Sequence, residues 1–390
     1  MRTDSRPSCM IRSFHIKRFR GIRECCLENL GQINILIGRN NSGKSSILEA
    51  LYLLSAAFWP HDALRNEEKV SYLIKRRGAG WNANSLWFGY TRDEPIEVEA
   101  VLTHGQDSNR GYSARARLFE WSEEPLLIMD EDVLMKHGID PAYRFVKIFT
   151  DGSLKVYRVN GSEGPLIPKD TARRMLDESF GNYDRIRDFL GNLLLLDASL
   201  LTRLEEVEGV LWPTLLRERR DKMLAEVVSE GYGIKVEGFS YLPVETEGKR
   251  VYKLVVEHED GFVLAEDLGD GAKRSILILS AASAYPGSLI LIEEPENHQH
   301  PGGLYTMLKV LTRLLVENRS QLIMTTHSAE VLSITRGVVE EIREAGMSTE
   351  MVVMFIERDS EGRVFVRRLS KDEINKFEEM RFDVRFLDLI

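Results

Sequence analysis

The stretch LIGRNNSGKSSILEAL, residues 36–51, decides which fold this chain adopts. It begins inside the apolar run INILI at 33–37, and such a run predicts a strand buried on both faces. A glycine-rich turn follows, and a helix is predicted from Lys44 to about Phe58. A buried strand, a glycine-rich turn and a helix, in this order, predict a site that binds phosphate groups.

The turn matches the phosphate-binding pattern G-x-x-x-x-G-K-[ST] at Gly38, Gly43, Lys44 and Ser45. Glycine lets backbone N–H groups point inward at phosphate oxygens, and the start of the helix adds partial positive charge. We expect Lys44 to meet the β- and γ-phosphates of a nucleoside triphosphate, and the Ser45 hydroxyl to bind Mg²⁺.

A second apolar strand ends in two acids. The run LILI at 289–292 leads directly into Glu293 and Glu294 within SLILIEEPENHQHP. In a parallel sheet this strand would lie beside the first, so its carboxyl end would face the phosphates. We expect Glu293 to hold Mg²⁺ through water, and Glu294 to orient and deprotonate the attacking water.

A third apolar strand, in QLIMTTHSAEVL, ends at Thr325 and Thr326 and leads into His327. Ser328 is a good N-cap for the helix that follows. We expect His327 to lie at the same sheet edge as Lys44 and to hydrogen-bond the γ-phosphate or the attacking water.

Another glycine-rich turn opens the apolar helix in LGDGAKRSILILSAA. It is a second helix start of the kind that binds anions. Because one triphosphate needs one cradle, we expect Gly269, Asp270 and Gly271 to meet a nucleotide held by another subunit.

The rest of the chain predicts an α/β protein with an inserted middle. Segments between 95 and 160 alternate and are separated by turns, which predicts antiparallel strands. Helices and strands alternate from 271 to about 345, which predicts a parallel core sheet. We expect an N-terminal tail at 1–9 and one head over 10–390, with an antiparallel β-lobe over 60–165 and a helical insertion over 166–232.

Composition limits the environment of the chain. The net charge is −9, there are three cysteines and no CxxC pair, and no apolar run approaches about 20 residues. The basic N-terminus has no apolar core of the kind that signal peptides carry. These features favour a cytoplasmic protein without a membrane segment.

Taken together, these motifs resemble an ABC-type ATPase head of the SMC/RecF/OLD branch, in which OLD means overcoming-lysogenization-defect. The stretches GRNNSGKSSILEAL, IEEPENHQHP, TTHSAE and HIKRFRGIRE carry the resemblance, firmly over about 10–60 and 260–335. It implies an ATPase that uses ATP and Mg²⁺, with two heads that form a homodimer around two ATP molecules.

The resemblance assigns residues as follows. It implies that Glu294 is the catalytic acidic residue, that His327 and Lys44 are also catalytic, and that Arg20 lies near the nucleotide. Gly269 to Ala272 cap the partner's γ-phosphate. The residues implied to wrap the phosphates are Arg39, Asn40, Asn41, Ser42, Gly43, Lys44, Ser45 and Ser46.

The chain also departs from that branch. Gly269 stands where the signature serine contacts the γ-phosphate, and Lys273 or Arg274 are the candidates to compensate. The interval between Gly43 and Gly271 has no sustained heptads, and no nuclease motif follows His327. These differences predict a stand-alone ATPase with a conformational output.

Two interpretations of that output stay open. One is an ATP hydrolase in DNA repair or antiviral defence that works with a separate nuclease or effector. The alternative is a nucleotide-gated assembly scaffold with slow hydrolysis. Basic clusters at 74–77, 172–174 and 217–220 are either solvated faces or a grip on DNA or RNA. A transporter subunit is disfavoured, because the signature lacks a Ser-Gly-Gly run.

Overall fold

The computed structural model describes residues 9–77, 82–104, 111–202, 204–246, 249–347 and 349–379. The chain divides into two compact units, each built from segments that are distant in the sequence. Residues 1–8 of the expected tail lie outside the described residues. Unit 1 comprises Met1–Gly31, Arg39–Leu193 and Met354–Arg368, and unit 2 comprises Gln32–Gly38, Leu194–Val353 and Leu369–Ile390.

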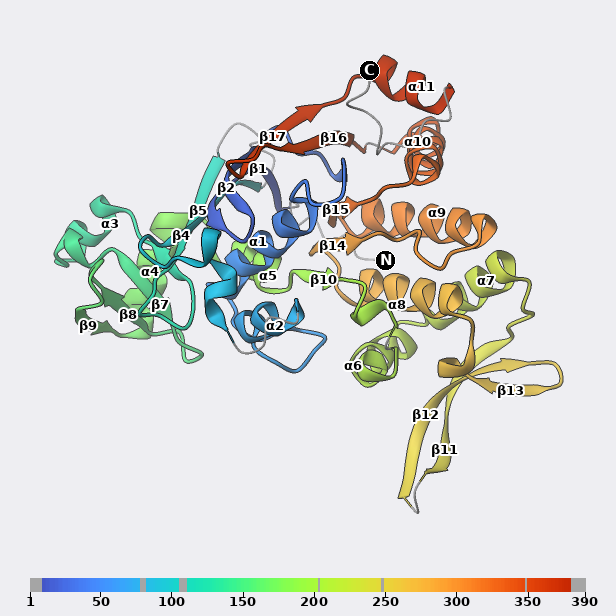
Figure 1. Cartoon of the computed structure of the whole chain (residues 1–390). Helices are drawn as coiled ribbons and strands as arrows, with labels where there is room; N and C mark the ends of the chain where they lie inside the picture. The colour runs from blue at the N-terminus through green and yellow to red at the C-terminus, as the bar shows by residue number, and fades with distance from the viewer. Residues whose placement is uncertain are drawn as a thin grey trace. The chain divides into compact units, whose positions relative to one another are not determined.

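Parallel strands form the core of unit 2, in the order β10, β14, β15, β3. Figure 1 labels the first three of these strands. Glu293 pairs with Thr325 and Thr325 pairs with Leu36, so β14, β15 and β3 end at one edge. Every residue of these three strands is buried, which confirms the strands predicted from their apolar runs. The bounds are Ile33–Ile37 for β3, Leu194–Leu196 for β10, Leu289–Glu293 for β14 and Gln321–Thr325 for β15.

Helices alternate with these strands along the chain, as expected for a parallel sheet. Helix α9 contacts α7, α8 and α10, and Figure 1 shows α9 between α8 and α10. A separate antiparallel sheet contains β11, β12 and β13, and β11 and β12 form a long hairpin (Figure 1). The bounds are Leu204–Arg217 for α6, Asp221–Tyr232 for α7, Gly238–Thr246 for β11, Lys249–His258 for β12, Gly261–Leu264 for β13, Asp270–Ala284 for α8, Pro301–Glu317 for α9, Ala329–Glu344 for α10 and Lys371–Glu379 for α11.

Unit 1 is dominated by antiparallel strands, in the order β17, β2, β1, β4, β5, β6, β7, β8, β9. Only β17 and β2 pair in parallel among these neighbours, over Arg363 and Val364. The bounds of the strands are Cys9–Phe19 for β1, Ile22–Leu27 for β2, Ile96–His104 for β4, Gly111–Leu118 for β5, Leu126–Ile128 for β6, Phe145–Ile148 for β7, Leu154–Tyr157 for β8, Glu163–Ile167 for β9, Met351–Arg358 for β16, which passes from unit 2 into unit 1, and Arg363–Arg368 for β17.

Helices accompany these strands in unit 1. Helix α1 begins at Lys44, as predicted, and all but one of its residues are buried. The antiparallel strands and the parallel core confirm the predicted α/β class. No helix among the described ranges is long and apolar enough to cross a membrane. The bounds are Lys44–Ala56 for α1, Lys69–Arg76 for α2, Glu131–Lys136 for α3, Lys169–Phe180 for α4 and Tyr183–Gly191 for α5.

Candidate functional site

The loop that follows β3 leads into a helix start that is open to an anion. Gly43 is the N-cap residue of α1, with φ at 104°, a conformation that favours glycine. Glycine offers no capping side chain, and the first turn of α1 contains no acid. The N–H groups of this turn are therefore positively polarised and suited to a phosphate.

Side chains of the same loop also fit a phosphate group. The Nζ atom of Lys44 donates to the carbonyl oxygen of Arg39 at 2.7 Å, so the lysine folds back over the loop. Lys44 is buried, with 6% of its surface exposed. The buried Oγ atom of Ser42 has no hydrogen-bond partner among the described residues. A phosphate would offer acceptors to both side chains, so the loop residues fit the triphosphate that the sequence predicts.

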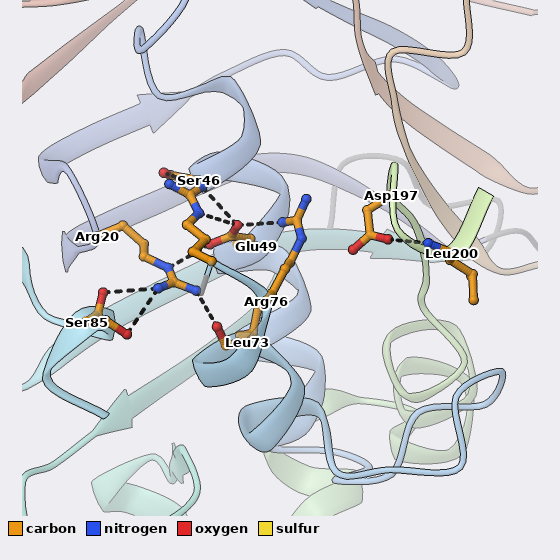
Figure 2. A network of polar contacts seen from close by, with 9 residues as sticks. Arg20, Ser46, Glu49, Leu73, Arg76, Ser85, Asp197 and Leu200 are labelled. Carbon is orange, nitrogen blue, oxygen red and sulfur yellow. Dashed lines mark hydrogen bonds and ion pairs between the residues drawn. The ribbon is translucent and has the colours of Figure 1, made fainter. Parts of the chain in front are cut away.

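One buried carboxylate in α1 is shared by three arginines. Two of them, Arg20 and Arg76, are labelled in Figure 2. Glu49 of α1 is fully buried. Its Oε2 accepts from the Nε of Arg20 at 2.7 Å, and its Oε1 accepts from Arg76 at 2.5 Å and from Arg77 at 2.8 Å. Arg77 also donates to the Oγ of Ser46 at 3.3 Å. The cluster therefore connects the first turn of α1 to the end of α2.

Arg20 is one of the three arginines that pair with Glu49. Its Nη1 donates to the carbonyl of Ser85 at 3.1 Å, and its Nη2 donates to the carbonyl of Leu73. Burial lowers the pKa of its guanidinium, and the charge of Glu49 opposes that shift. Each nitrogen of the Arg20 guanidinium thus has a partner within unit 1. Its expected contact with a nucleotide stays a prediction.

The two acids and the histidine predicted at the strand edge lie within unit 2. Glu294 follows β14, and its Oε1 lies 3.3 Å from the Nε2 of His327. Its Oε2 accepts from the Nδ2 of Asn297 at 2.7 Å. Glu294 has φ at 44°, a left-handed conformation that strains a non-glycine residue and is frequent at functional sites. Glu293 is buried at the end of β14. The predicted base and histidine are therefore neighbours.

Glu296 binds the backbone of His327. Its Oε1 accepts from the Oγ1 of Thr326 at 2.6 Å and from the backbone N–H of His327 at 3.0 Å. Ser328 caps α10 by accepting from the N–H of Glu330 at 3.1 Å, which confirms the predicted N-cap. The N–H of His327 is therefore held by Glu296, and the N–H of the next residue, Ser328, donates to the Oγ1 of Thr326 at 2.9 Å.

The start of α8 is tied to the loop that follows β14. The Tyr232 hydroxyl donates to the carbonyl oxygen of Gly271 at 2.8 Å, and the Nε2 of Gln299 donates to the same oxygen at 3.1 Å. A Cβ atom at Gly271 would lie 2.8 Å from the carbonyl oxygen of His298, so only glycine fits there without a shift. Gly269 is the N-cap residue, and the first-turn acid Asp270 pairs with Lys273 at 2.9 Å.

Magnesium ligation stays a prediction for Ser45 and Glu293. Within the described ranges, no group of three or more His, Cys, Asp or Glu residues could hold a metal ion. A hydroxyl and a carboxylate are ligand types that Mg²⁺ accepts when phosphate oxygens and water complete its shell.

Sequence reasoning missed several residues of this arrangement. Glu49 could have been found, because it is an acid inside the apolar run ILEALYLLSA and such an acid needs a buried partner. Asn297 and Glu296 stand in the quoted stretch after β14 but have no signal of their own. Arg77 stands in the basic cluster at 74–77, but the sequence does not pair it with Glu49, and Tyr232 offers no signal, since their partners are distant in the sequence.

Comparison with known proteins agrees with the phosphate-binding loop. A family model described as "AAA domain, putative AbiEii toxin, Type IV TA system" matches residues 33–333. The chain is 24% identical to a Helicobacter pylori protein named ATP/GTP phosphatase over 348 aligned residues. This alignment covers 85% of this chain and 89% of that protein. A Methanocaldococcus jannaschii protein, Uncharacterized protein MJECL10, is 67% identical over 52 residues, which are 13% of this chain and 24% of that protein.

Solved structures show a distant likeness. An SMC head bound to the C-winged helix domain of ScpA aligns with a TM-score of 0.49 at 12% identity, over 93% of this chain and 98% of that chain. The SMC head domain from Thermotoga maritima aligns with a TM-score of 0.45 at 11% identity, over 92% and 99% respectively.

Proposed function

We propose that this chain, which belongs to this AAA-domain family, binds ATP with Mg²⁺ and hydrolyses ATP to ADP and phosphate. The observation that carries the proposal is the contact of Glu294 with His327 at the edge where β14, β15 and β3 end. The phosphate-binding loop begins at this same edge, because Gly38 follows β3 directly. The name of the Helicobacter pylori relative is consistent with nucleotide hydrolysis.

Each residue has a distinct role in this proposal. Lys44 and the N–H groups of the first turn of α1 bind the phosphates, and Ser45 and Glu293 hold the magnesium, which neutralises phosphate charge when bound. Glu294 accepts a proton from the attacking water. The contacts of Glu294 with Asn297 and His327 hold its carboxylate in one orientation, which favours in-line attack.

We further propose that two copies dimerise around ATP, with Gly269, Asp270 and Gly271 of one copy near the nucleotide of the other. Lys273 supports this role, because it pairs with Asp270 and offsets an acid that would otherwise repel phosphate. In this proposal the output is a conformational change that is passed to a separate effector in DNA repair or antiviral defence, and DNA or RNA is a second ligand. A family description that includes a toxin is consistent with a role in defence.

Phosphate release from ATP and from GTP tests the catalytic part of the proposal. Glu294→Gln should lower turnover by about 10²-fold or more and leave ATP affinity within about threefold, because a base is lost and the phosphate contacts remain. Glu317→Gln, which changes an exposed acid at the end of α9, is the matched control and should keep parental turnover. Parental turnover in Glu294→Gln would refute the assigned role.

Light scattering after size exclusion tests the dimer. Wild type and Glu294→Gln are run with and without ATP, and we expect a doubled mass for Glu294→Gln with ATP, because slow hydrolysis preserves the ATP-bound state. An unchanged mass in every condition would remove the dimer from the proposal. A Glu294→Gln variant that assembles and keeps its downstream activity would favour the scaffold alternative over the hydrolase.

A further inference from the structure

Arg274, in the second turn of α8, is a buried cation with unmet hydrogen-bonding capacity. Only 2% of its surface is exposed, and its Nε and Nη1 atoms have no hydrogen-bond partner among the described residues. Burial lowers the pKa of its guanidinium, while the charges of Asp270, Glu294 and Glu296 act in the opposite direction. Unsatisfied buried donors are unfavourable, so we expect this arginine to gain partners in another state of the protein.

The carboxylate of Glu296 has an oxygen that lacks a hydrogen-bond partner among the described residues. Its Oε1 accepts two hydrogen bonds, from Thr326 and from the backbone of His327, whereas its Oε2 is buried and has no partner in the described part of the chain. The charge of Glu296 is one of three acidic charges, with those of Asp270 and Glu294, that act to raise the pKa of the Arg274 guanidinium. A guanidinium with two open donors and a carboxylate with one open oxygen are suited to form a charge-assisted hydrogen bond.

The segments that carry these two residues are joined. Gln299, in the loop after β14, donates to the carbonyl oxygen of Gly271, and this contact ties the start of α8 to that loop. Tyr232, at the end of α7, donates to the same oxygen. In that loop Glu294 and His298 have φ at 44° and 62°. Strained backbone of this kind is held in place by its surroundings, so a shift of α8 would be passed to this loop.

We propose that Arg274 is a positioning residue whose guanidinium binds the open Oε2 of Glu296 when a nucleotide engages the start of α8. This inference rests on the proposed function. The new contact would fix Glu296, which holds the backbone N–H of His327, and would set the approach of His327 to Glu294. Arg274 therefore acts on the rate of hydrolysis and leaves nucleotide affinity unchanged.

Three substitutions test this role. Arg274→Gln and Glu296→Gln should each lower kcat by about tenfold or more, with the Kd for ATP within about twofold of the parent. Arg274→Lys keeps the positive charge and should recover part of the loss. The double variant should be no slower than the slower single variant, because both changes remove the same contact. Arg313→Gln alters an exposed arginine of α9 and should keep the parental kcat.

The outcomes separate the two proposals. A wild type that releases no phosphate overturns the proposed function and, with it, the positioning role. An active wild type with parental kcat in folded Arg274→Gln, or with additive losses in the double variant, overturns the positioning role alone.

A second measurement covers the case in which Arg274→Gln does not fold. The backbone amide NMR signal of His327 should shift when wild type binds a non-hydrolysable ATP analogue, and this shift should be much smaller in Glu296→Gln. Equal shifts in the two proteins overturn the positioning role.

Discussion

Replacing Glu49 by glutamine removes the carboxylate that Arg20, Arg76 and Arg77 share, and it changes almost nothing in shape. Glu49 is fully buried, and the side chains of Arg20 and Arg76 are 4% and 12% exposed. After the substitution these two guanidiniums would face a neutral amide, whose NH₂ group is itself a donor. Two buried cations would then lie close together without their anion.

The expected cost follows from burial. A hydrogen bond to a charged group contributes about 1.5–3 kcal/mol, and Arg20 and Arg76 each make one with Glu49 in a largely buried setting. The contact with Arg77 is discounted, because that side chain is 42% exposed. We therefore expect Glu49→Gln to lower the free energy of unfolding by about 4 kcal/mol, within the range for breaking a buried ion pair.

Urea unfolding followed by tryptophan fluorescence measures this change, because Trp59, Trp87 and Trp121 all lie in unit 1. With a denaturant slope of about 3 kcal/mol/M, the midpoint should fall by roughly 1 M. The matched control is Glu131→Gln, which breaks an ion pair with Arg144 whose acid is 58% exposed. The control should change stability by less than about 1 kcal/mol.

Equal urea midpoints for Glu49→Gln and Glu131→Gln would refute a stabilising role for the shared carboxylate. That result would mean that the arginines reach water or other anions when the carboxylate is neutralised. Arg77→Gln adds a finer comparison within the cluster. It should cost less than about 1 kcal/mol, because the exposed Arg77 side chain is screened by solvent.

Three further changes probe other parts of the chain. Burial lowers the pKa of Lys69 to about 7, so above that pH the unfolded chain binds more protons than the folded chain does. The free energy of unfolding should therefore rise from pH 7 to about 10, by at most about 1.4 kcal/mol per pH unit. Urea titrations of Lys69→Met at several pH values should lack this part of the slope. Gly271→Ala would press a Cβ against the carbonyl of His298 at 2.8 Å and should lower turnover about tenfold or more; parental phosphate release would contradict this. Ser328→Ala removes the N-cap of α10 and should cost about 1 kcal/mol, measured as a lower thermal midpoint, whereas Ser360→Ala at a surface turn should leave it unchanged.

Local sequence was sufficient to predict the strands and the phosphate-binding loop. β3, β14 and β15 are short apolar runs buried on both faces, and a run of this kind has few other folded arrangements. Gly43 is the N-cap residue of α1, and its φ of 104° is a conformation that favours glycine. The placement of Glu294 and His327 at one edge also followed, since the carboxyl ends of parallel strands coincide.

The partners of charged and polar side chains could be found only in the folded chain. Arg20 meets Glu49 across 29 positions and Ser85 across 65, and Tyr232 meets Gly271 across 39. Periodicity and turn chemistry act over a few residues, whereas these contacts depend on how distant segments pack. A buried charge, such as that of Arg274, is stable or unstable according to what packing places around it, so its role is a property of the tertiary structure.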